Sequence, residues 1–501
     1  MPGPRTLASV WAAKSATLAS RRLRRGGGTA VSGLVGLKLQ SSLIHDLASQ
    51  LGHGCVLVTG TNGKTTTSRL ISETARAAGL QPLANASGSN LMRGLASTLA
   101  AATGPGGRLT DAAQRLGVFE VDEAAVPAAL QELRPRVAVF TNLFRDQLDR
   151  FGEVEAVAAL WRQALAKAPP GLTLVLNADD PAVASLGEGR DNVIYFGVDD
   201  AKLDRGAIEH ASDALSCAVC GSRLEYNIAY FGHVGHWRCP GCGRPRPEVA
   251  VSGRDLDLRD GRTLGFEIVV VGNHEWAVDQ PPHPNPLLEG EGIMEPRVEA
   301  STDMTDAENA SMPVEMGIGG LYNAYNALAA AAAVIALGLP AGATPEALKA
   351  TGAAFGRQEA FEVDGKGVEL FLGKNPAGLN QVLSTLLLDP NRKVVLIILN
   401  DGIADGRDIS WVWDADFEVT AKQFDKVLVS GTRAAEMALR LKYAEWDEAA
   451  LTVEPEIGAA LEKALAATRD GECLTVVPTY TAMLTVRELL AKRTGRASFW
   501  Q

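Results

Sequence analysis

A glycine-rich segment, GTNGKTTT at residues 60–67, has the composition of a phosphate-binding loop. It follows an apolar run typical of a buried strand and precedes a helical pattern, which is the context in which such loops occur. Gly60 and Gly63 would let the backbone turn so that its N–H groups face phosphate oxygens. Lys64 would neutralise the outer phosphates, and the Thr65 hydroxyl would bind Mg²⁺. Although the G-x2-G-K-T spacing is shorter than the usual G-x4-G-K-[ST], the segment predicts a site for a nucleoside triphosphate.

A group of acids follows a second apolar run, in FEVDEAAV at residues 119–126. We expect Glu120, ahead of Asp122 and Glu123, to complete the Mg²⁺ site, because carboxylate oxygens suit this cation. The alternative is that these acids favour the start of a helix through its dipole. A further polar turn, TNLFRDQLDRFGEVE at residues 141–155, also follows an apolar run, and its density of charged groups favours a site over a solvated loop.

Four cysteines form two CxxC pairs: Cys217, Cys220, Cys239 and Cys242. Four thiolates close a tetrahedron around Zn²⁺ and leave no open position, so the predicted metal is structural. It would fold a module too small to have its own core. His233 and His236 lie close by in the sequence, and we interpret them as surface residues. Cys55 and Cys473 each lie in an apolar run and are expected to be buried thiols.

An acid-rich turn, LNDGIADGRDISWVWDADFE at residues 399–418, follows the apolar run VVLIIL. It contains Asp401, Asp405 and Asp408 beside glycines and tryptophans. The residue types alone are compatible with a magnesium site, a general base or a solvated loop. The residue types of this turn therefore do not decide between the three roles.

The elements that position these residues are those of an α/β protein. Short β-branched runs begin near residues 55, 117, 137 and 172, and helical stretches alternate with them. This pattern predicts a doubly wound parallel sheet, whose ligands gather at the carboxyl ends of the strands. Three more runs, KVVLIILND, KVLVSGT and LTVVPTY, predict a second, smaller α/β domain. The expected divisions are a basic N-terminal segment (1–40), a central ATPase domain (41–318), linking helices (319–355) and a C-terminal α/β domain (356–501).

Two segments interrupt the central domain. The cysteine pairs lie in a module at about residues 213–248, which we expect to be an inserted zinc ribbon. A Pro-, Glu- and Ser-rich stretch at about residues 279–313 has little periodicity and is predicted to be a disordered loop.

The charge of the chain is acidic overall and basic at its start. The 501 residues carry a net charge of −11 and have a pI near 5.3, which argues against a nucleic-acid partner. Residues 1–38 hold seven Lys and Arg and no Asp or Glu. Such a segment is either a solvated helix or a peripheral contact with an anionic membrane or a phosphorylated lipid. No run is long enough to span a membrane, and no signal peptide is evident, so a cytoplasmic location is expected.

Four segments carry a family resemblance: GTNGKTTT, TNLFRDQLDRFG, LNADDP and GLYNAYNALAA. They resemble the central ATPase domain of Mur ligases and folylpolyglutamate synthases, which activate a carboxylate as an acyl phosphate for attack by an amine. The cysteine pairs, with FGRQE, KNPAG and NDGIADGRDISW, narrow the similarity to the MurT family, the ligase-like subunits of lipid II isoglutaminyl synthase. The resemblance runs from about residue 40 to the C-terminus, apart from the Pro-rich stretch.

The resemblance implies an amidation. ATP would phosphorylate the α-carboxylate of D-glutamate in the lipid II stem peptide, and ammonia would convert the acyl phosphate to D-isoglutamine. A separate class I-type glutaminase, similar to GatD, would supply the ammonia and form a heterodimer with this chain. Asp408 would complete the Cys–His pair of that partner as a third member, with Asp401 and Asp405 as alternatives. The implied cofactors are ATP, Mg²⁺ and structural Zn²⁺.

The same resemblance assigns the nucleotide-binding residues: Thr61, Asn62, Gly63, Lys64, Thr65 and Thr66 around ATP and Mg²⁺, and Asn323 and Asn326 near the adenine, to which the residue types add Glu120 at the Mg²⁺. One departure concerns LGKNPAG, which stands where amino-acid-adding Mur ligases have an Asp-rich segment with His-Asn-Pro. An incoming amino acid needs groups that recognise its carboxylate and side chain, whereas ammonia does not. This departure therefore favours amidation over the addition of an amino acid. The alternatives are a Mur-type or folylpolyglutamate-type ligase that adds an amino acid, and a zinc-ribbon scaffold with a relict nucleotide domain.

Overall fold

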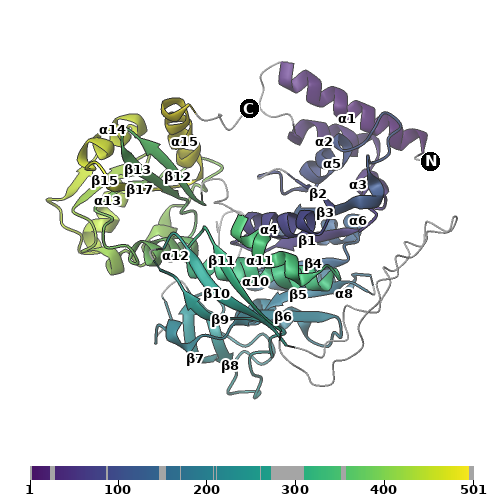
Figure 1. Cartoon of the computed structure of the whole chain (residues 1–501), viewed down its shortest axis with the longest axis horizontal. Coiled ribbons are helices and arrows are strands. Elements are labelled where there is room, and N and C mark those ends of the chain that lie inside the picture. The colour runs from purple at the N-terminus through teal and green to yellow at the C-terminus, as the bar shows by residue number, and fades with distance from the viewer. Residues whose placement is uncertain are drawn as a thin grey trace.

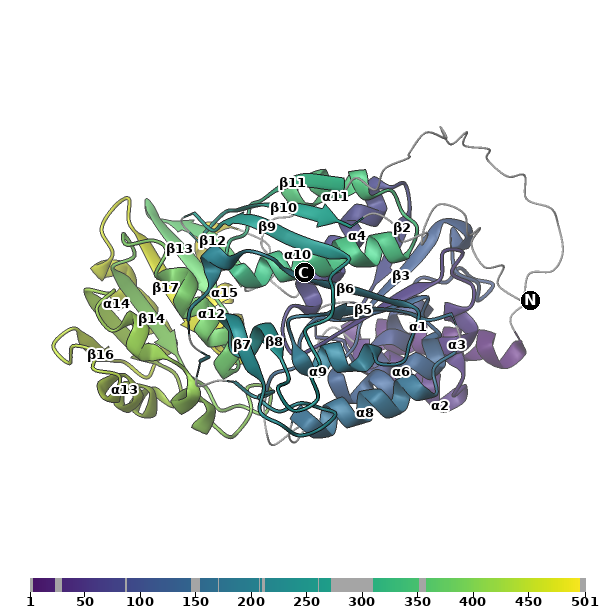
Figure 2. The same ribbon diagram turned by 90° about the horizontal axis from the view of Figure 1, so that it is seen from below.

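The computed structural model describes residues 3–22, 29–85, 88–145, 154–169, 171–206, 208–209, 212–259, 261–271, 310–350 and 357–495. Figure 1 shows two α/β bodies: a large central one and, to its left, a smaller one formed by the C-terminal part of the chain. Two N-terminal helices lie on the opposite side of the central body from the C-terminal domain (Figures 1 and 2).

The central domain is built on a sheet of nine strands. In spatial order these are β11 (Ala310–Met316), β10 (Leu264–Val270), β9 (Val251–Asp257), β6 (Val193–Val198), β5 (Thr173–Asn177), β4 (Val137–Phe140), β1 (Cys55–Thr59), β3 (Arg115–Glu120) and β2 (Gln81–Ala84). The strands from β9 to β2 are parallel, and β10 and β11 extend the sheet antiparallel at one edge. The sequence-based prediction of a doubly wound parallel sheet is confirmed.

Helices cover both faces of this sheet because side chains alternate along each buried strand. Val56 and Val58 of β1 face one core, and Cys55 and Leu57 face the other. The first core includes α4 (Lys64–Ala77), α10 (Leu321–Ala336) and α11 (Thr344–Ala350). The second includes α3 (Leu43–Ala48), α5 (Met92–Ala101), α6 (Val126–Leu133) and α8 (Val154–Ala166). A short helix, α9 (Pro181–Ala184), follows β5.

The C-terminal domain has a six-stranded sheet with helices on both faces. Its strands, in spatial order, are β12 (Arg357–Val363), β13 (Lys366–Phe371), β17 (Cys473–Pro478), β14 (Val394–Ile398), β15 (Lys426–Ser430) and β16 (Leu451–Val453). All neighbouring pairs are parallel except β12–β13. One face packs on α12 (Pro376–Leu386) and α13 (Ala434–Tyr443), the other on α14 (Ile457–Ala467) and α15 (Tyr480–Thr494).

The N-terminal segment forms α1 (Pro4–Arg22) and α2 (Thr29–Leu39), which pack beside α5. Ser32 of α2 and Ser97 of α5 share a hydrogen bond of 2.7 Å. Trp11 and Leu18, seven residues apart on α1, are 52% and 64% exposed. Across the described residues, none of the helices combines the length and apolar character required to cross a bilayer.

Two expectations about the segments differ from the structure. The stretch predicted to be disordered ends in β11, whose residues Ala310–Pro313 pair with β10, so its C-terminal boundary was wrong. Residues 279–309 of that stretch lie outside the described residues. Helix α10, placed among linking helices, is instead a core helix of the central domain, and Asn323–Val334 are buried along it.

Candidate active site

The phosphate loop connects the carboxyl end of β1 to the first turn of α4. Gly60 and Gly63 have φ angles of +134° and +88°, which favour glycine. A Cβ on Gly63 would lie 2.1 Å from Asn326 Oδ1, so any other residue here would have to displace the Asn326 side chain. Among the described residues, no side chain caps α4, so its first N–H groups are available to an anion.

Lys64 is buried and held by two acceptors. Its Nζ donates to Gly60 O at 2.6 Å and to Glu123 Oε1 at 2.8 Å. Burial alone would lower the pKa of Lys64, but the carboxylates of Glu123, Asp122 and Glu120 outweigh it and raise the pKa. The lysine is therefore charged at neutral pH, and Glu123 is its partner when no phosphate is bound.

Thr65 and Glu120 meet beside the first turn of α4. The Thr65 hydroxyl donates to Glu120 Oε1 at 3.0 Å, and Asn90 Nδ2 donates to the same oxygen at 2.7 Å. Asn85 Oδ1 accepts from the Glu120 backbone N–H at 2.9 Å. A hydroxyl and a carboxylate oxygen side by side suit the hard, oxygen-preferring Mg²⁺ ion. The residues fit this ion, and Thr65 and Glu120 remain its predicted ligands.

Amide side chains at the carboxyl ends of neighbouring strands fix the loop. Asn142 Oδ1 accepts from the Asn62 backbone N–H at 2.9 Å, and Thr141 Oγ1 donates to Asn62 O at 2.8 Å. Asn177 Nδ2 donates to Thr141 O at 3.0 Å. The Thr61 hydroxyl donates to Phe144 O at 2.9 Å, so it positions the loop from behind. Thr66 is buried in the first turn of α4.

A cavity next to the phosphate loop lies between the two α/β domains. Its aromatic lining consists of Phe144, Phe231, Tyr322, Tyr325 and Phe371. Its amide lining consists of Asn62, Asn142, Asn177, Asn326, Gln358 and Gln381. Flat aromatic rings beside amide donors and acceptors suit a purine base.

The two asparagines assigned to the adenine have different places. Asn326 lines the cavity, and its Oδ1 accepts from the Thr67 hydroxyl at 3.4 Å. Asn323 lies behind it: its Oδ1 accepts from Asn326 Nδ2 at 3.1 Å, and its own Nδ2 donates to Gly319 O at 2.7 Å. Asn323 therefore orients Asn326.

The C-terminal domain reaches the phosphate loop through the start of α12. Asn375 Nδ2 donates to Asn62 Oδ1 at 3.2 Å, while Asn375 Oδ1 caps the helix at Gly378 N, 2.7 Å away. Lys374 lines the cavity. The segment KNPAG thus lies at this cavity.

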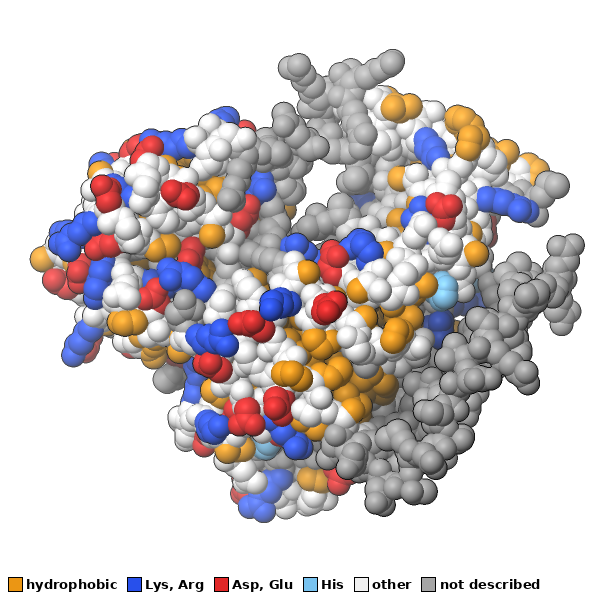
Figure 3. Space-filling model, viewed as in Figure 1, with side chains coloured by type: hydrophobic (Ala, Val, Ile, Leu, Met, Phe, Trp, Pro, Cys, Tyr) orange, Lys and Arg blue, Asp and Glu red, His pale blue; other side chains and the backbone are white. Residues whose placement is uncertain are grey.

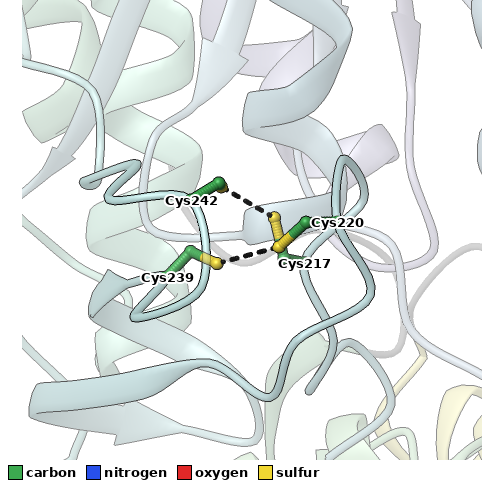
Figure 4. Close-up of side chains that lie close together, drawn as sticks. All are labelled: Cys217, Cys220, Cys239 and Cys242. Carbon is green, nitrogen blue, oxygen red and sulfur yellow. Dashed lines mark hydrogen bonds between the residues drawn. The ribbon is translucent and has the colours of Figure 1, made fainter.

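The four paired cysteines converge as the sequence predicts. Their Sγ atoms all lie within 4.8 Å of one another, with Cys217–Cys242 at 3.7 Å and Cys220–Cys239 at 3.4 Å (Figure 4). Zn–S bonds of about 2.3 Å in a tetrahedron place sulfur atoms about 3.8 Å apart. The geometry therefore fits Zn²⁺, and the closed set of four thiolates fits a structural role.

The histidines of this module are not both surface residues. His233 is fully buried, with its Nε2 3.4 Å from Asp180 Oδ2 and its ring 4.4 Å from that of Phe144. The surface interpretation of His233 was wrong because the hairpin of β7 (Glu225–Phe231) and β8 (Val234–Arg238) docks on the central domain. His236 is half-buried, and neither histidine belongs to the cysteine cluster.

The acid-rich turn gives its three candidate aspartates three different environments. Asp405 is buried and accepts from the backbone N–H and hydroxyl of Thr481 at the start of α15. Asp401 accepts from Arg433 Nε at 2.8 Å. Asp408 is exposed and accepts from Ser410 N at 2.8 Å. Hydrogen bonds from Ser410 lower the pKa of Asp408, so it is charged at neutral pH.

The two remaining cysteines have environments that keep them protonated. Burial raises the pKa of Cys55 to about 12, against a smaller opposite effect of Arg136. Burial also raises the pKa of Cys473 to about 11. A thiol is a weak nucleophile unless it ionises, so neither is suited to glutamine hydrolysis.

Some residues of the cavity were not assigned to it from the sequence. Phe231 lies in no quoted motif, and Tyr322 and Gln358 lie in the quoted segments GLYNAYNALAA and FGRQE but were given no role there; the three come from separate elements and meet only in the folded chain. The turn at residues 141–155 is described in part: Asn142 and Arg145 are placed, whereas Asp146, Asp149 and Arg150 lie outside the described residues.

Two family models match this chain. Residues 58–236 match the Mur ligase middle domain, and residues 372–483 match the MurT ligase C-terminal domain. The chain is 32% identical over 486 residues to the MurT subunit of the glutamine-hydrolysing lipid II isoglutaminyl synthase of Staphylococcus aureus (strain COL), covering 96% of this chain and 97% of that protein. The corresponding subunit of Streptococcus pneumoniae (strain R6) is also 32% identical, with 94% of each chain covered.

Solved structures share the fold. A pseudomurein peptide ligase type C from Methanothermus fervidus superposes with a TM-score of 0.62 at 22% identity, over 88% of this chain and 78% of that one. MurF from Acinetobacter baumannii superposes with a TM-score of 0.61 at 14% identity, over 93% and 81% of the two chains. At these identities the likeness concerns the fold.

Proposed function

This chain belongs to the MurT family, and on that premise we propose that it is the ligase subunit of a lipid II isoglutaminyl synthase. Its relatives with that name match it over nearly their whole length. The observation that carries the proposal is the set of Lys64, Thr65 and Glu120 at a phosphate loop whose neighbouring residues Asn62 and Gly63 line a cavity shared by two domains.

The proposed reaction has two steps. A carboxylate oxygen of the D-glutamate residue in the stem peptide attacks the γ-phosphorus of ATP, which gives an acyl phosphate and ADP. Ammonia then attacks the acyl carbon, inorganic phosphate leaves with the C–O bonding pair, and the nitrogen loses a proton to give the amide. Both steps need a charged, water-poor site that holds the phosphates in line.

The chain's own residues supply that environment. Lys64 exchanges Glu123 for phosphate oxygens, and the first N–H groups of α4 bind the same anion. Thr65 and Glu120 would hold Mg²⁺, which neutralises charge between the outer phosphates. Asn326 and the aromatic lining would receive the adenine.

Ammonia would come from a GatD-like glutaminase bound as a heterodimer. Asp408 is the best placed of the three aspartates to serve that partner, because it is charged, exposed and not committed to the domain core. A carboxylate in this position would orient the imidazole of the partner's Cys–His pair. The protonated state of Cys55 and Cys473 is consistent with the nucleophile lying on the other chain.

The rival function is a ligase that adds an amino acid. The test is to incubate the purified chain with ATP, Mg²⁺ and lipid II, and to supply either ammonium or free amino acids. We expect an amidated product and ADP with ammonium. Turnover with a free amino acid and none with ammonium would overturn the proposal in favour of the rival, and no ATP turnover in any mixture would favour a scaffold.

We also propose a cytoplasmic protein that contacts the membrane through α1. The outward face of α1 carries the exposed Trp11 and Leu18, and the surrounding segment is basic. An apolar face beside cations suits an anionic lipid surface. Vesicles with anionic lipid should retain the protein, and Trp11→Ser together with Leu18→Ser should release it; equal retention would exclude this contact.

A further inference from the structure

We propose that the module at about residues 213–248, which carries the four cysteines, forms one wall of the nucleotide cavity. Binding of the metal to the cysteines and binding of the nucleotide to the cavity would then each strengthen the other. This inference rests on the proposed function only in taking the cavity to be the nucleotide site. It assigns to the metal a role that reaches beyond folding the module itself.

The wall is formed by the end of β7. Phe231, the last residue of this strand, is buried and lines the cavity. Its ring stacks on that of Phe144, with centroids 5.9 Å apart, and meets Tyr325 edge to face at 5.5 Å. Phe144 follows β4, and Tyr325 belongs to α10. The three rings are therefore in contact only when the module packs against both β4 and α10.

The hairpin is seated on the turn that follows β5. Trp237 Nε1 donates to Ala178 O at 3.0 Å, and the Gly235 backbone N–H donates to Asp179 O at 3.0 Å. The residue before Ala178 is Asn177, the last residue of β5, which lines the cavity. The hairpin thus touches the cavity directly through Phe231 and indirectly through the turn.

A buried carboxylate extends the connection. Asp179 is fully buried and accepts from Tyr325 Oη at 2.6 Å, and it forms an ion pair with Arg246, near the C-terminal end of the module. A buried charge that loses its partner is costly. If the module moved away and Arg246 with it, Asp179 would disturb Tyr325, which lines the same cavity.

The cysteines hold this hairpin in place. Cys239 directly follows β8, and Cys217 and Cys239 share a small apolar cluster with Leu224, Trp237 and Ala184 of α9. Such a cluster is too small to fold alone, so the metal supplies the missing stability. Trp237, which bonds to Ala178, belongs to that cluster, and this links the metal to the cavity wall.

The test measures binding on the full chain. The protein with its native zinc and the same protein treated with a chelator are titrated with a non-hydrolysable ATP analogue in the presence of Mg²⁺. We expect removal of zinc to weaken binding by about tenfold or more, the size of one lost base–aromatic contact. Because coupling is reciprocal, the analogue should also slow zinc transfer to a chromophoric chelator.

Two variants keep the test decisive if zinc removal unfolds the chain. Phe231→Ala should keep its full zinc content and lose affinity for the analogue by about tenfold. Arg238→Ala is the matched control on the same hairpin, because this side chain is exposed and pairs with Glu225. It should bind as the unaltered chain does.

The outcomes separate the two proposals. If the zinc-loaded unaltered chain does not bind the analogue, the proposed function fails. If it binds, and the folded zinc-free chain binds equally well, the coupling is overturned. Should the zinc-free chain unfold, unchanged affinity in Phe231→Ala with full zinc content would overturn it as well.

Discussion

The phosphate loop and the acid-rich turn are both polar segments at the carboxyl end of a buried strand, yet their polar groups are satisfied differently. In the phosphate loop, Lys64 pairs with Glu123 and Thr65 with Glu120, all within one domain. In the acid-rich turn, Asp405 accepts a hydrogen bond from Thr481 within its own domain. Asp408 is exposed, and among the described contacts it accepts only from Ser410. Under the proposed function, the first site is complete in this chain and the second is completed by the partner chain.

The change with the largest expected effect is Lys64→Met, which removes the charge from the complete site. We expect the ammonium-driven and glutamine-driven amidations to fall together by on the order of 100-fold or more, because both use the same phosphorylated intermediate. Rates of ADP release with each nitrogen source check this. Retention of either activity would show that Lys64 does not contact the transferred phosphate.

The second change, Asp408→Asn, should separate the two activities. With the partner present, glutamine-driven amidation should fall by about 100-fold or more, since an amide cannot orient an imidazole as a carboxylate does. Ammonium-driven amidation should be unchanged. Asp401→Asn is the matched control, because Asp401 pairs with Arg433 in its own domain. Loss of both activities in Asp408→Asn would place this residue in the ligase site.

The third change tests how tightly the complete site is built. Gly63→Ala adds a Cβ that would lie 2.1 Å from Asn326 Oδ1, at a φ of +88°. Gly79→Ala has a similar φ of +83° but meets nothing within 4 Å. We expect the first to weaken binding of an ATP analogue by about tenfold, corresponding to about 1.4 kcal/mol, and the second to leave it unchanged. Equal effects would mean that backbone strain, and not the contact with Asn326, is responsible.

The smallest effect is expected at the link between the two regions. Arg145, which follows β4, pairs with Asp414 of the acid-rich turn at 2.9 Å, and its backbone N–H donates to Asp213. The pair is partly exposed, so Arg145→Ala should cost below about 1 kcal/mol of unfolding free energy. Thermal denaturation measures this. A larger loss would show that the pair fixes the orientation of the two domains.

The sequence predicts those parts of the site whose residues are close together along the chain. The phosphate loop, the cysteine pairs and the parallel strands of both sheets follow from local pattern, and the structure confirms the strands and brings the cysteines together. The partner of Lys64 could not be chosen this way, because Glu120 and Glu123 lie in one acidic run. Which acid faces the lysine depends on how the chain turns after β3.

The aromatic lining could not be predicted for a similar reason. Phe144 and Tyr325 lie in segments that the sequence analysis singled out and Phe231 does not, but nothing in the sequence places the three together; only the packing of the hairpin on the central domain does so. The buried state of His233 follows from the same packing. Strand β11 was missed because it lies in a Pro- and Ser-rich segment, where pairing with β10 overrides local propensity.

The net charge of −11 does not make the surface uniformly acidic. Acidic and basic side chains are interspersed over the face seen in Figure 3, and this face is hollowed between the C-terminal domain and the N-terminal helices. A mixed surface of this kind favours specific pairs over broad attraction to one sign of charge.

The antiparallel edge of the central sheet has a practical consequence for the long segment that joins β10 to β11. Strand β10 starts three residues after Gly261, whose carbonyl accepts from Gln358 Nε2 at the nucleotide cavity, and it ends at Val270, which pairs directly with Ala310. Seven residues of antiparallel strand separate these ends by roughly 20 Å. The 38 residues between Val271 and Ala310 are therefore attached at the end of the hairpin remote from the cavity. A short turn joining the two strands should leave catalysis intact, and this junction is the place to attach a label or tether.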